Sequence, residues 1–132
     1  MQSDDTMPPP EAEVLSFLYR YDLVVDLDTS ILTTCHAARK IRGRPIVCGV
    51  LASLIFARGR PVTPEALYRQ VWGGGEYHPL RHRNALYVAV NRARGALREL
   101  LGRPAAIETL PSGWRLAPDL DACVIRSIGE AQ

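Results

Sequence analysis

The sequence predicts an α+β fold with a small N-terminal antiparallel sheet, three helices and a C-terminal β-hairpin. Two observations support this prediction. Apolar residues recur at helical spacing in the middle of the chain, and short β-branched stretches bounded by turn residues lie on both sides. With 132 residues, of which 47% are hydrophobic, the chain suits a single globular domain.

Short strands are expected ahead of the helices. Residues 21–27 and 31–35 are rich in β-branched side chains and are separated by an Asp-Thr-Ser turn, and residues 38–41 could add a third strand. Residues 1–20 are acidic and Pro-rich, and we expect them to form a flexible arm. Within and just beyond this arm, residues 11–21 could form a short helix.

Two helices are expected between the sheet and a glycine run. The first begins at Pro45, because proline suits the first turn of a helix, and its apolar residues recur at helical spacing up to Gly59. The second begins at Thr63, which is a favourable N-cap residue followed by proline and glutamate. The glycines at positions 73–75 end it.

The third helix, predicted over residues 82–101, has an apolar face and an adjacent polar face. At 100° per residue, its core residues fall within about 60° of one direction. The neighbouring sector carries Asn84, Tyr87, Asn91, Arg94 and Arg98. Asparagine matches the edge of adenine, and arginine matches guanine or phosphate, so this face suits the DNA major groove. An ordinary solvated surface helix is the alternative interpretation.

Residues 106–117 are expected to form the hairpin, because β-forming stretches flank the sequence Pro-Ser-Gly. A helix, a loop, a basic helix and then a hairpin make up a winged helix-turn-helix. In that architecture one helix enters the major groove and the hairpin lies beside it. We therefore predict such a domain over residues 21–118, followed by a C-terminal tail of residues 119–132.

Charge is unevenly distributed along the chain, although the net charge is only +2. Residues 1–28 have a balance of −6, residues 39–103 of +10 and residues 104–132 of −2. A segment as basic as the central one is expected to attract a polyanion, unless its charges are simply solvated. Most of these cations are arginine, whose planar fork matches both phosphate and base edges.

Several motifs together resemble the OmpR/PhoB-type winged-helix effector domain of bacterial response regulators, and the similar winged helix of SARP-type activators. The resemblance covers about residues 22–118. The motifs are Gly59, Val-Thr-Pro-Glu-Ala-Leu at 62–67, Val-Trp-Gly at 71–73, Leu-x-Val-x-Val at 86–90, Arg92-x-Arg94, Leu97, Thr109 and Gly-Trp-Arg-Leu at 113–116.

This resemblance implies a four-stranded N-terminal sheet and a bacterial, DNA-binding regulator of transcription. It also implies that the loop 73–83 contacts RNA polymerase or shapes the contacts with DNA. The recognition residues it implies are Asn84, Tyr87, Asn91, Arg92 and Arg94. The 132 residues hold no phosphoacceptor receiver domain, so we expect a switch other than phosphorylation if they are the whole protein.

The function expected from these features is sequence-specific binding of double-stranded DNA by a transcriptional regulator, with helix 82–101 in the major groove and hairpin 106–117 as the wing. A homodimer is expected on DNA, because one such domain reads few base pairs. The expected DNA-binding residues are Arg83, Asn84, Tyr87, Asn91, Arg92, Arg94, Arg98 and Arg115. The alternative is a winged-helix protein-interaction module that binds RNA polymerase or another regulatory protein.

Catalysis, cofactors and metals are not expected. The three histidines and three cysteines do not form a four-ligand zinc pattern, and the glycine run lacks the Lys-Ser/Thr of a phosphate loop. The odd number of cysteines without CxxC spacing indicates reduced thiols in a cytoplasmic protein. No apolar run reaches the roughly 18–20 residues needed to span a bilayer.

Overall fold

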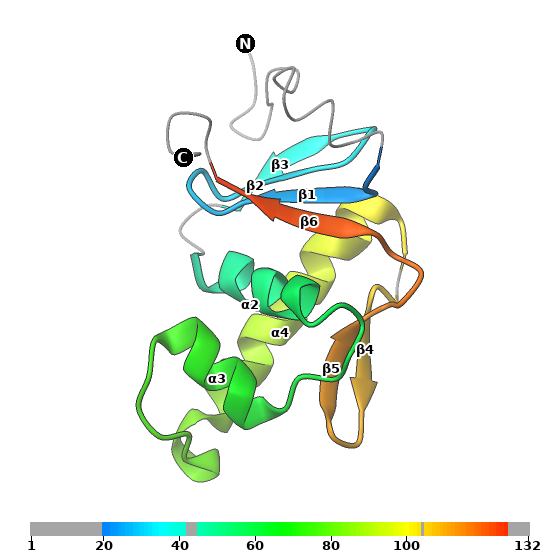
Figure 1. The fold of residues 1–132 in the computed structure, drawn as a ribbon. Coiled ribbons are helices and arrows are strands. Elements are labelled where there is room, and N and C mark those ends of the chain that lie inside the picture. Colours follow the sequence, from blue (N-terminus) through cyan, green and yellow to red (C-terminus); the bar gives the residue numbers. More distant parts are fainter. Residues whose placement is uncertain (1–19, 42–44, 104, 127–132) are drawn as a thin grey trace.

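The computed structural model describes residues 20–41, 45–103 and 105–126. It confirms the predicted α+β winged-helix fold. A four-stranded sheet lies at one end of the molecule, three helices lie next to it, and a separate hairpin lies beside the helices (Figure 1). The arm of residues 1–20 and the short helix considered for residues 11–21 fall almost entirely outside the described residues.

The main sheet has the strand order β3-β2-β1-β6. Strand β1 (Leu23–Asp26) pairs antiparallel with β2 (Ile31–Thr33), and β2 pairs antiparallel with β3 (Ala38–Lys40). These three strands lie within the stretches that the sequence predicted. The turn between β1 and β2 is closed by Asp26, whose carboxylate accepts the backbone N–H of Asp28 at 2.9 Å.

The resemblance implied four strands in the N-terminal part of the chain, but the described residues form only three there, and the fourth strand is C-terminal. Strand β6 (Ala122–Ile125) pairs parallel with β1, with Leu23 opposite Ala122, although residues 119–132 were predicted to form a tail. The sheet is therefore mixed, and not antiparallel throughout as predicted. All four residues of β6, Ala-Cys-Val-Ile, are apolar and half-buried. The segment therefore lacks the alternation of apolar and polar residues that indicates a strand in a sequence. The four-stranded sheet is therefore built from three N-terminal strands and one C-terminal strand.

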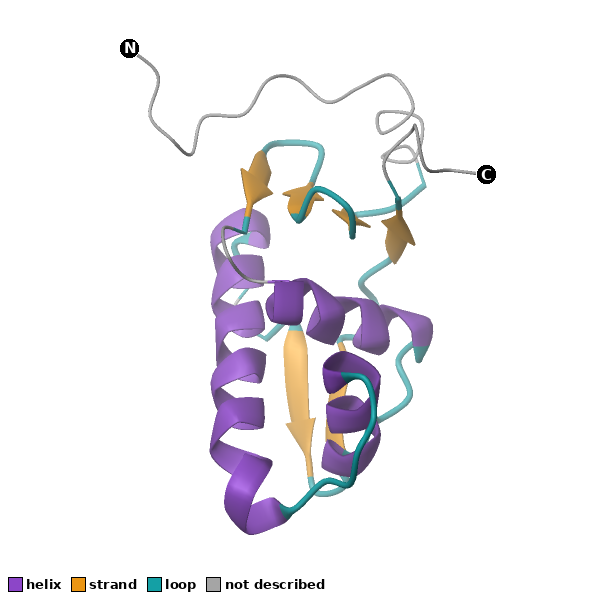
Figure 2. Ribbon diagram, turned by 90° about the vertical axis from the view of Figure 1, so that its left-hand side faces the viewer, coloured by secondary structure: helices purple, strands orange, loops and turns teal. Residues whose placement is uncertain are grey.

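Helix α2 (Pro45–Phe56) lies between the sheet and helix α3 (Pro64–Trp72), and helix α4 (Pro79–Leu101) runs alongside it up to the sheet (Figure 2). Its side chains Val50, Leu51 and Leu54 are fully buried, as its helical apolar spacing predicted. Contact with elements on several sides explains why most of its residues are apolar, since a helix that is hydrophobic all round belongs in a core.

Helix α3 (Pro64–Trp72) begins and ends at the predicted signals. The hydroxyl of Thr63 accepts the backbone N–H of Ala66 at 3.2 Å, which satisfies one of the free donors of the first turn. Gly73 ends the helix in the left-handed conformation, with φ of 81°. Its one fully buried side chain, Leu67, fixes the helix to the core.

Helix α4 (Pro79–Leu101) starts three residues earlier than residue 82, the predicted start. Pro79 takes the first helical position directly after the N-cap residue His78, which proline's fixed φ favours. The loop predicted over residues 73–83 is consequently shorter and covers residues 73–78. Gly102 ends α4 in the left-handed conformation.

The predicted hairpin is formed by β4 (Ile107–Leu110) and β5 (Gly113–Leu116). A third segment joins it, because Val62 and Trp114 exchange two backbone hydrogen bonds of 2.7 and 3.0 Å. The backbone of Gly113 lies so close to this segment that an added Cβ would be 2.7 Å from the carbonyl carbon of Val62. The wing is thereby fixed to the chain just before α3.

Candidate nucleic-acid interface

The outward face of α4 carries most of the side chains that the sequence predicted to bind DNA. The helix forms the left edge of the molecule in Figure 2. Its apolar face, including Leu86, Val90 and Leu97, is buried. The predicted site residues that are exposed on α4 are Arg83, Asn84, Tyr87, Asn91, Arg92 and Arg98.

Three of these side chains are free to bind a ligand. Asn84, Arg92 and Arg98 form no hydrogen bond or ion pair with any residue that the structure describes. Arg83 instead lies over the ring of Tyr87, with 5.2 Å between its guanidinium carbon and the ring centroid. The unpaired amide and guanidinium groups are the donors that a groove edge or a phosphate would use.

Arg94 differs from its neighbours because it is held by the wing. Its Nε donates to the backbone oxygen of Ile107 at 3.3 Å, and its Nη2 donates to the hydroxyl of Thr109 at 2.8 Å. Its Nη1 donates to the side-chain oxygen of Asn91 at 2.8 Å. Three of its five N–H groups are thus occupied, and the guanidinium fixes strand β4 against α4.

An aromatic contact supports the same junction. The ring of Tyr87 meets Trp114 of β5 edge to face, with 5.4 Å between the ring centroids. Trp114 is buried, whereas Tyr87 remains 40% exposed. A small pocket of about 140 Å³ lies between these residues and is also lined by Asn91, Arg94 and Thr109. The helix and the wing therefore form one continuous surface.

The remaining predicted site residue lies apart from α4. Arg115 on β5 donates from its Nε to the carboxylate of Glu108 on β4 at 2.7 Å, and both side chains are about one-third exposed. The pair is exposed enough to contribute at most about 1 kcal/mol to stability. The tip of the wing, Leu110 to Ser112, carries no charged side chain.

A cluster of rings at the start of α4 was not predicted from the sequence. The ring of His82 stacks on Tyr68 of α3 with 4.3 Å between centroids, and Tyr68 stacks in turn on Trp72. The backbone N–H of His78 donates to Nδ1 of His82 at 3.1 Å, so this nitrogen is unprotonated. The cluster holds the loop 73–78 against the first turn of α4.

This cluster predicts a pH dependence. Partial burial, then the nearby charges of His78 and Arg81, lower the pKa of His82 from its ordinary value near 6.5. The unfolded chain therefore takes up this proton at a higher pH than the folded chain, and stability falls as the pH drops below about 6.5. We expect the amide protection factors in the loop 73–78, which are corrected for the slower intrinsic exchange in acid, to be lower at pH 5 than at pH 7.5. In a His82→Gln variant the difference should largely disappear; an unchanged difference would contradict the assignment.

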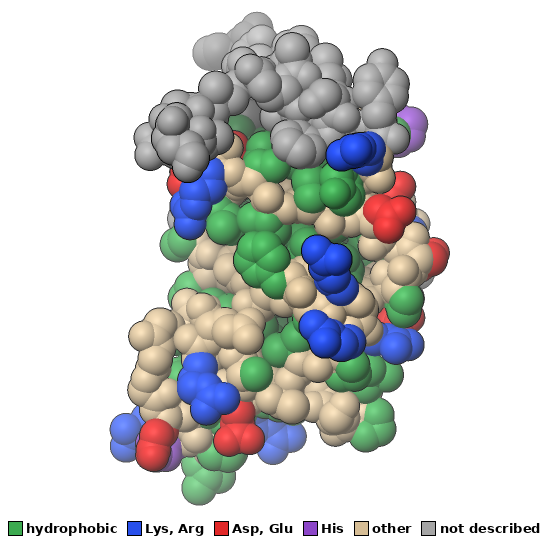
Figure 3. Space-filling model, in the orientation of Figure 1, with side chains coloured by type: hydrophobic (Ala, Val, Ile, Leu, Met, Phe, Trp, Pro, Cys, Tyr) green, Lys and Arg blue, Asp and Glu red, His purple; other side chains and the backbone are tan. Residues whose placement is uncertain are grey.

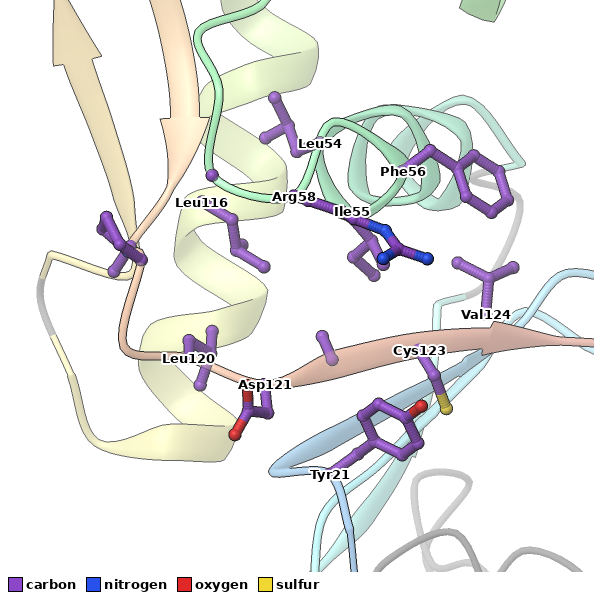
Figure 4. Close-up of a pocket in the computed structure, with 14 residues that line it drawn as sticks. Tyr21, Leu54, Ile55, Phe56, Arg58, Leu116, Leu120, Asp121, Cys123 and Val124 are labelled. Atoms are coloured by element: carbon purple, nitrogen blue, oxygen red, sulfur yellow. The ribbon is translucent and has the colours of Figure 1, made fainter.

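Another groove, of about 460 Å³, lies between the end of α2 and strand β6 (Figure 4). Phe56, which is 65% exposed, projects beside it, and hydrophobic side chains gather over this face (Figure 3). Cys123 is the only thiol in the groove, and burial raises its pKa to about 11. It is therefore protonated near neutral pH and is a poor nucleophile.

Other kinds of site find no support in the described residues. Over residues 20–41, 45–103 and 105–126, no group of three histidine, cysteine or acidic side chains is arranged to hold a metal ion. Among the described helices, none combines the length and apolar character needed to cross a membrane. The three cysteines are free.

No protein-family model matches the sequence, and a comparison with curated proteins found no match. Among solved structures, the DNA-binding domain of CadC from Escherichia coli superimposes with a TM-score of 0.61 at 15% identity. The alignment covers 74% of this chain and 87% of the CadC domain. A structure of EmbR from Mycobacterium tuberculosis, in complex with a low-affinity phosphopeptide, gives a TM-score of 0.58 at 26% identity. That alignment covers 74% of this chain but only 25% of the EmbR chain. The fold is therefore shared with a solved DNA-binding domain.

Proposed function

We propose that this protein is a bacterial transcriptional regulator that binds double-stranded DNA sequence-specifically, with α4 in the major groove and the β4–β5 hairpin as the wing. The observation that carries the proposal is the outward face of α4, where Asn84, Arg92 and Arg98 are exposed and have no partner among the described residues. On the same helix, Tyr87 and Arg94 contact the wing. The likeness to the CadC domain, which is a DNA-binding domain, supports the same function.

Each group has a distinct role in this proposal. The amides of Asn84 and Asn91 read base edges, since asparagine can bond to both the N6 and N7 positions of adenine. Arg83, Arg92 and Arg98 contact phosphate or guanine, and Tyr87 contacts the bases or sugars. Arg94 contacts DNA through the two N–H groups that it does not use within the protein.

To contact DNA, Arg115 would have to exchange its ion pair with Glu108 for one with a phosphate. Its guanidinium is paired with Glu108, so a phosphate must compete with a carboxylate for it. A phosphate can do so where the ion pair is exposed and weak.

We propose that two copies bind adjacent half-sites, because one recognition helix contacts only a few base pairs.

The decisive experiment starts with selection of bound duplexes from a random DNA pool. The selected duplex and a scrambled duplex are then compared across a salt series. We expect Asn84→Ala to weaken binding to the selected duplex by roughly tenfold, about 1.4 kcal/mol, while leaving the scrambled duplex unaffected. A base contact predicts this selective loss, whereas a phosphate contact would weaken both complexes equally.

The matched control is Gln70→Ala, which removes an exposed amide from α3 rather than α4. It should leave the ratio of the two affinities unchanged. Equal binding of selected and scrambled DNA by the unaltered protein would reduce the proposal to non-specific DNA binding. Absence of binding even at low salt would reject DNA as the ligand.

A protein-interaction module is the second candidate, and one observation favours it. Leu80 in the first turn of α4 is fully exposed, next to the loop 73–78. An exposed apolar side chain beside a loop that is held in place by stacked rings suits a protein partner such as RNA polymerase. If DNA binding fails, this alternative predicts that purified polymerase captures the unaltered protein but not the Leu80→Ser variant. Equal capture of both proteins, or capture of neither, would contradict it.

A further inference from the structure

A basic groove lies at the C-terminal part of α4, away from Asn84 and Asn91, whose amides read base edges in the proposal above. It has a volume of about 350 Å³ and lies between α4 and strand β3. Figure 2 shows α4 continuing up to the sheet at this end. Its lining consists of Arg39, Ile41, Val47, Arg92, Gly95, Ala96, Arg98 and Glu99.

Gly95 has no packing reason to be glycine. It lies in the middle of a 23-residue helix, where glycine costs about 1 kcal/mol relative to alanine. A Cβ added to it would meet no atom within 4 Å, and its backbone has ordinary helical geometry. The helix therefore loses stability at this position without any compensating contact inside the described protein.

Cations surround this glycine on both sides. Arg92 and Arg98 are three residues before and after it, so the three residues share one side of the helix, with the arginines each about 4.5 Å away along the axis. Both arginines are exposed and have no partner among the described residues. An anion bound between them would face two guanidinium groups, each with free N–H donors.

A third arginine approaches from the sheet. Arg39 of β3 forms an ion pair with Glu99 of α4, which are 60 residues apart in the chain. This pair bridges β3 and α4, and Glu99 is the only acidic side chain among the described residues that line the groove. The four charged side chains of the groove, three arginines and Glu99, have a net charge of +2. They surround Gly95, which has no side chain.

We propose that this groove binds the phosphate backbone of DNA, with Gly95 as the floor that lets the backbone approach α4 closely and Arg92 and Arg98 as its clamps. The inference rests on the proposed DNA binding and extends it from base reading to a defined backbone site. A methyl group on Gly95 would hold the phosphate away from both guanidinium groups. The cost of glycine in the helix is thus offset when DNA is bound.

The test is Gly95→Ala in the full chain, followed by thermal unfolding and DNA binding. We expect the Tm to rise by roughly 4 °C, because the helix gains stability. Affinity for the selected duplex and for scrambled DNA should fall together by roughly tenfold, since phosphate contacts are independent of sequence. A more stable protein with weaker binding is a result that general damage to the fold cannot produce.

A second pair of variants measures the charges. Removing one phosphate contact with Arg98→Ala should reduce the slope of log affinity against log salt by about 1. The control is Arg126→Ala, which removes one exposed arginine, paired with Asp28, directly after β6 at the opposite edge of the sheet from β3, and should leave the slope unchanged. If the unaltered protein binds DNA but Gly95→Ala binds equally well, the groove is not a backbone site. If the unaltered protein binds no DNA, the proposed function itself fails.

Discussion

Replacing Gly113 by alanine is expected to destabilise the protein by roughly 3 kcal/mol or more. An added Cβ would overlap the carbonyl oxygen of Val62 and lie 3.0 Å from the Cα of Thr63. Both obstacles are backbone atoms, so no side chain can rotate to make room. The hydrogen bonds between Val62 and Trp114 would have to open, which would separate the wing from the start of α3.

Urea unfolding of Gly113→Ala and Gly95→Ala measures this effect against a matched control. The same chemical change should lower the unfolding midpoint at position 113 and raise it at position 95, because only the first position is crowded. A midpoint for Gly113→Ala within the error of the unaltered protein would show that the wing is not fixed to the Val62 segment as described.

Replacing Arg94 is expected to have the largest effect on DNA binding. We expect both Arg94→Ala and Arg94→Lys to weaken specific binding by roughly tenfold to a hundredfold. Lysine retains the charge but cannot offer a planar fork to Ile107, Thr109 and Asn91 together. The wing would then lose its fixed position relative to α4, and amide exchange in β4 should become faster.

Arg98→Lys separates this positioning role from a simple charge. Arg98 has no partner among the described residues, so lysine there keeps a cation for phosphate and should cost little affinity. If Arg94→Lys also binds normally and shows unchanged exchange in β4, Arg94 acts only as a charge, and the anchoring role is wrong.

The parts of the fold that could be predicted are those set by neighbouring residues. Thr63 caps α3 and Gly73 ends it because each acts on backbone groups within four residues. Strand β6 could not be predicted, because its stability comes from pairing with β1 about a hundred residues away. A four-residue segment without alternation has no local signal that distinguishes it from a tail.

In the candidate site, too, features set by neighbouring residues could be predicted, and features set by distant residues could not. Helical periodicity was sufficient to place Asn84, Asn91 and Arg98 on one side of α4, since that grouping depends only on 3.6 residues per turn. The occupied donors of Arg94 could not be predicted, because its partners on β4 are fixed by the packing of the hairpin. Whether these residues touch DNA remains a prediction.

The parallel pairing of β1 and β6 also has a mechanical consequence. The chain enters β1 at Leu23 and leaves β6 at Ile125, which lie at opposite ends of the paired strands. Tension applied between the two flanking segments would therefore pull the strands along each other, and their hydrogen bonds would bear the load together rather than open one by one. A domain tethered on both sides would transmit force along the chain while helix α4 stays folded.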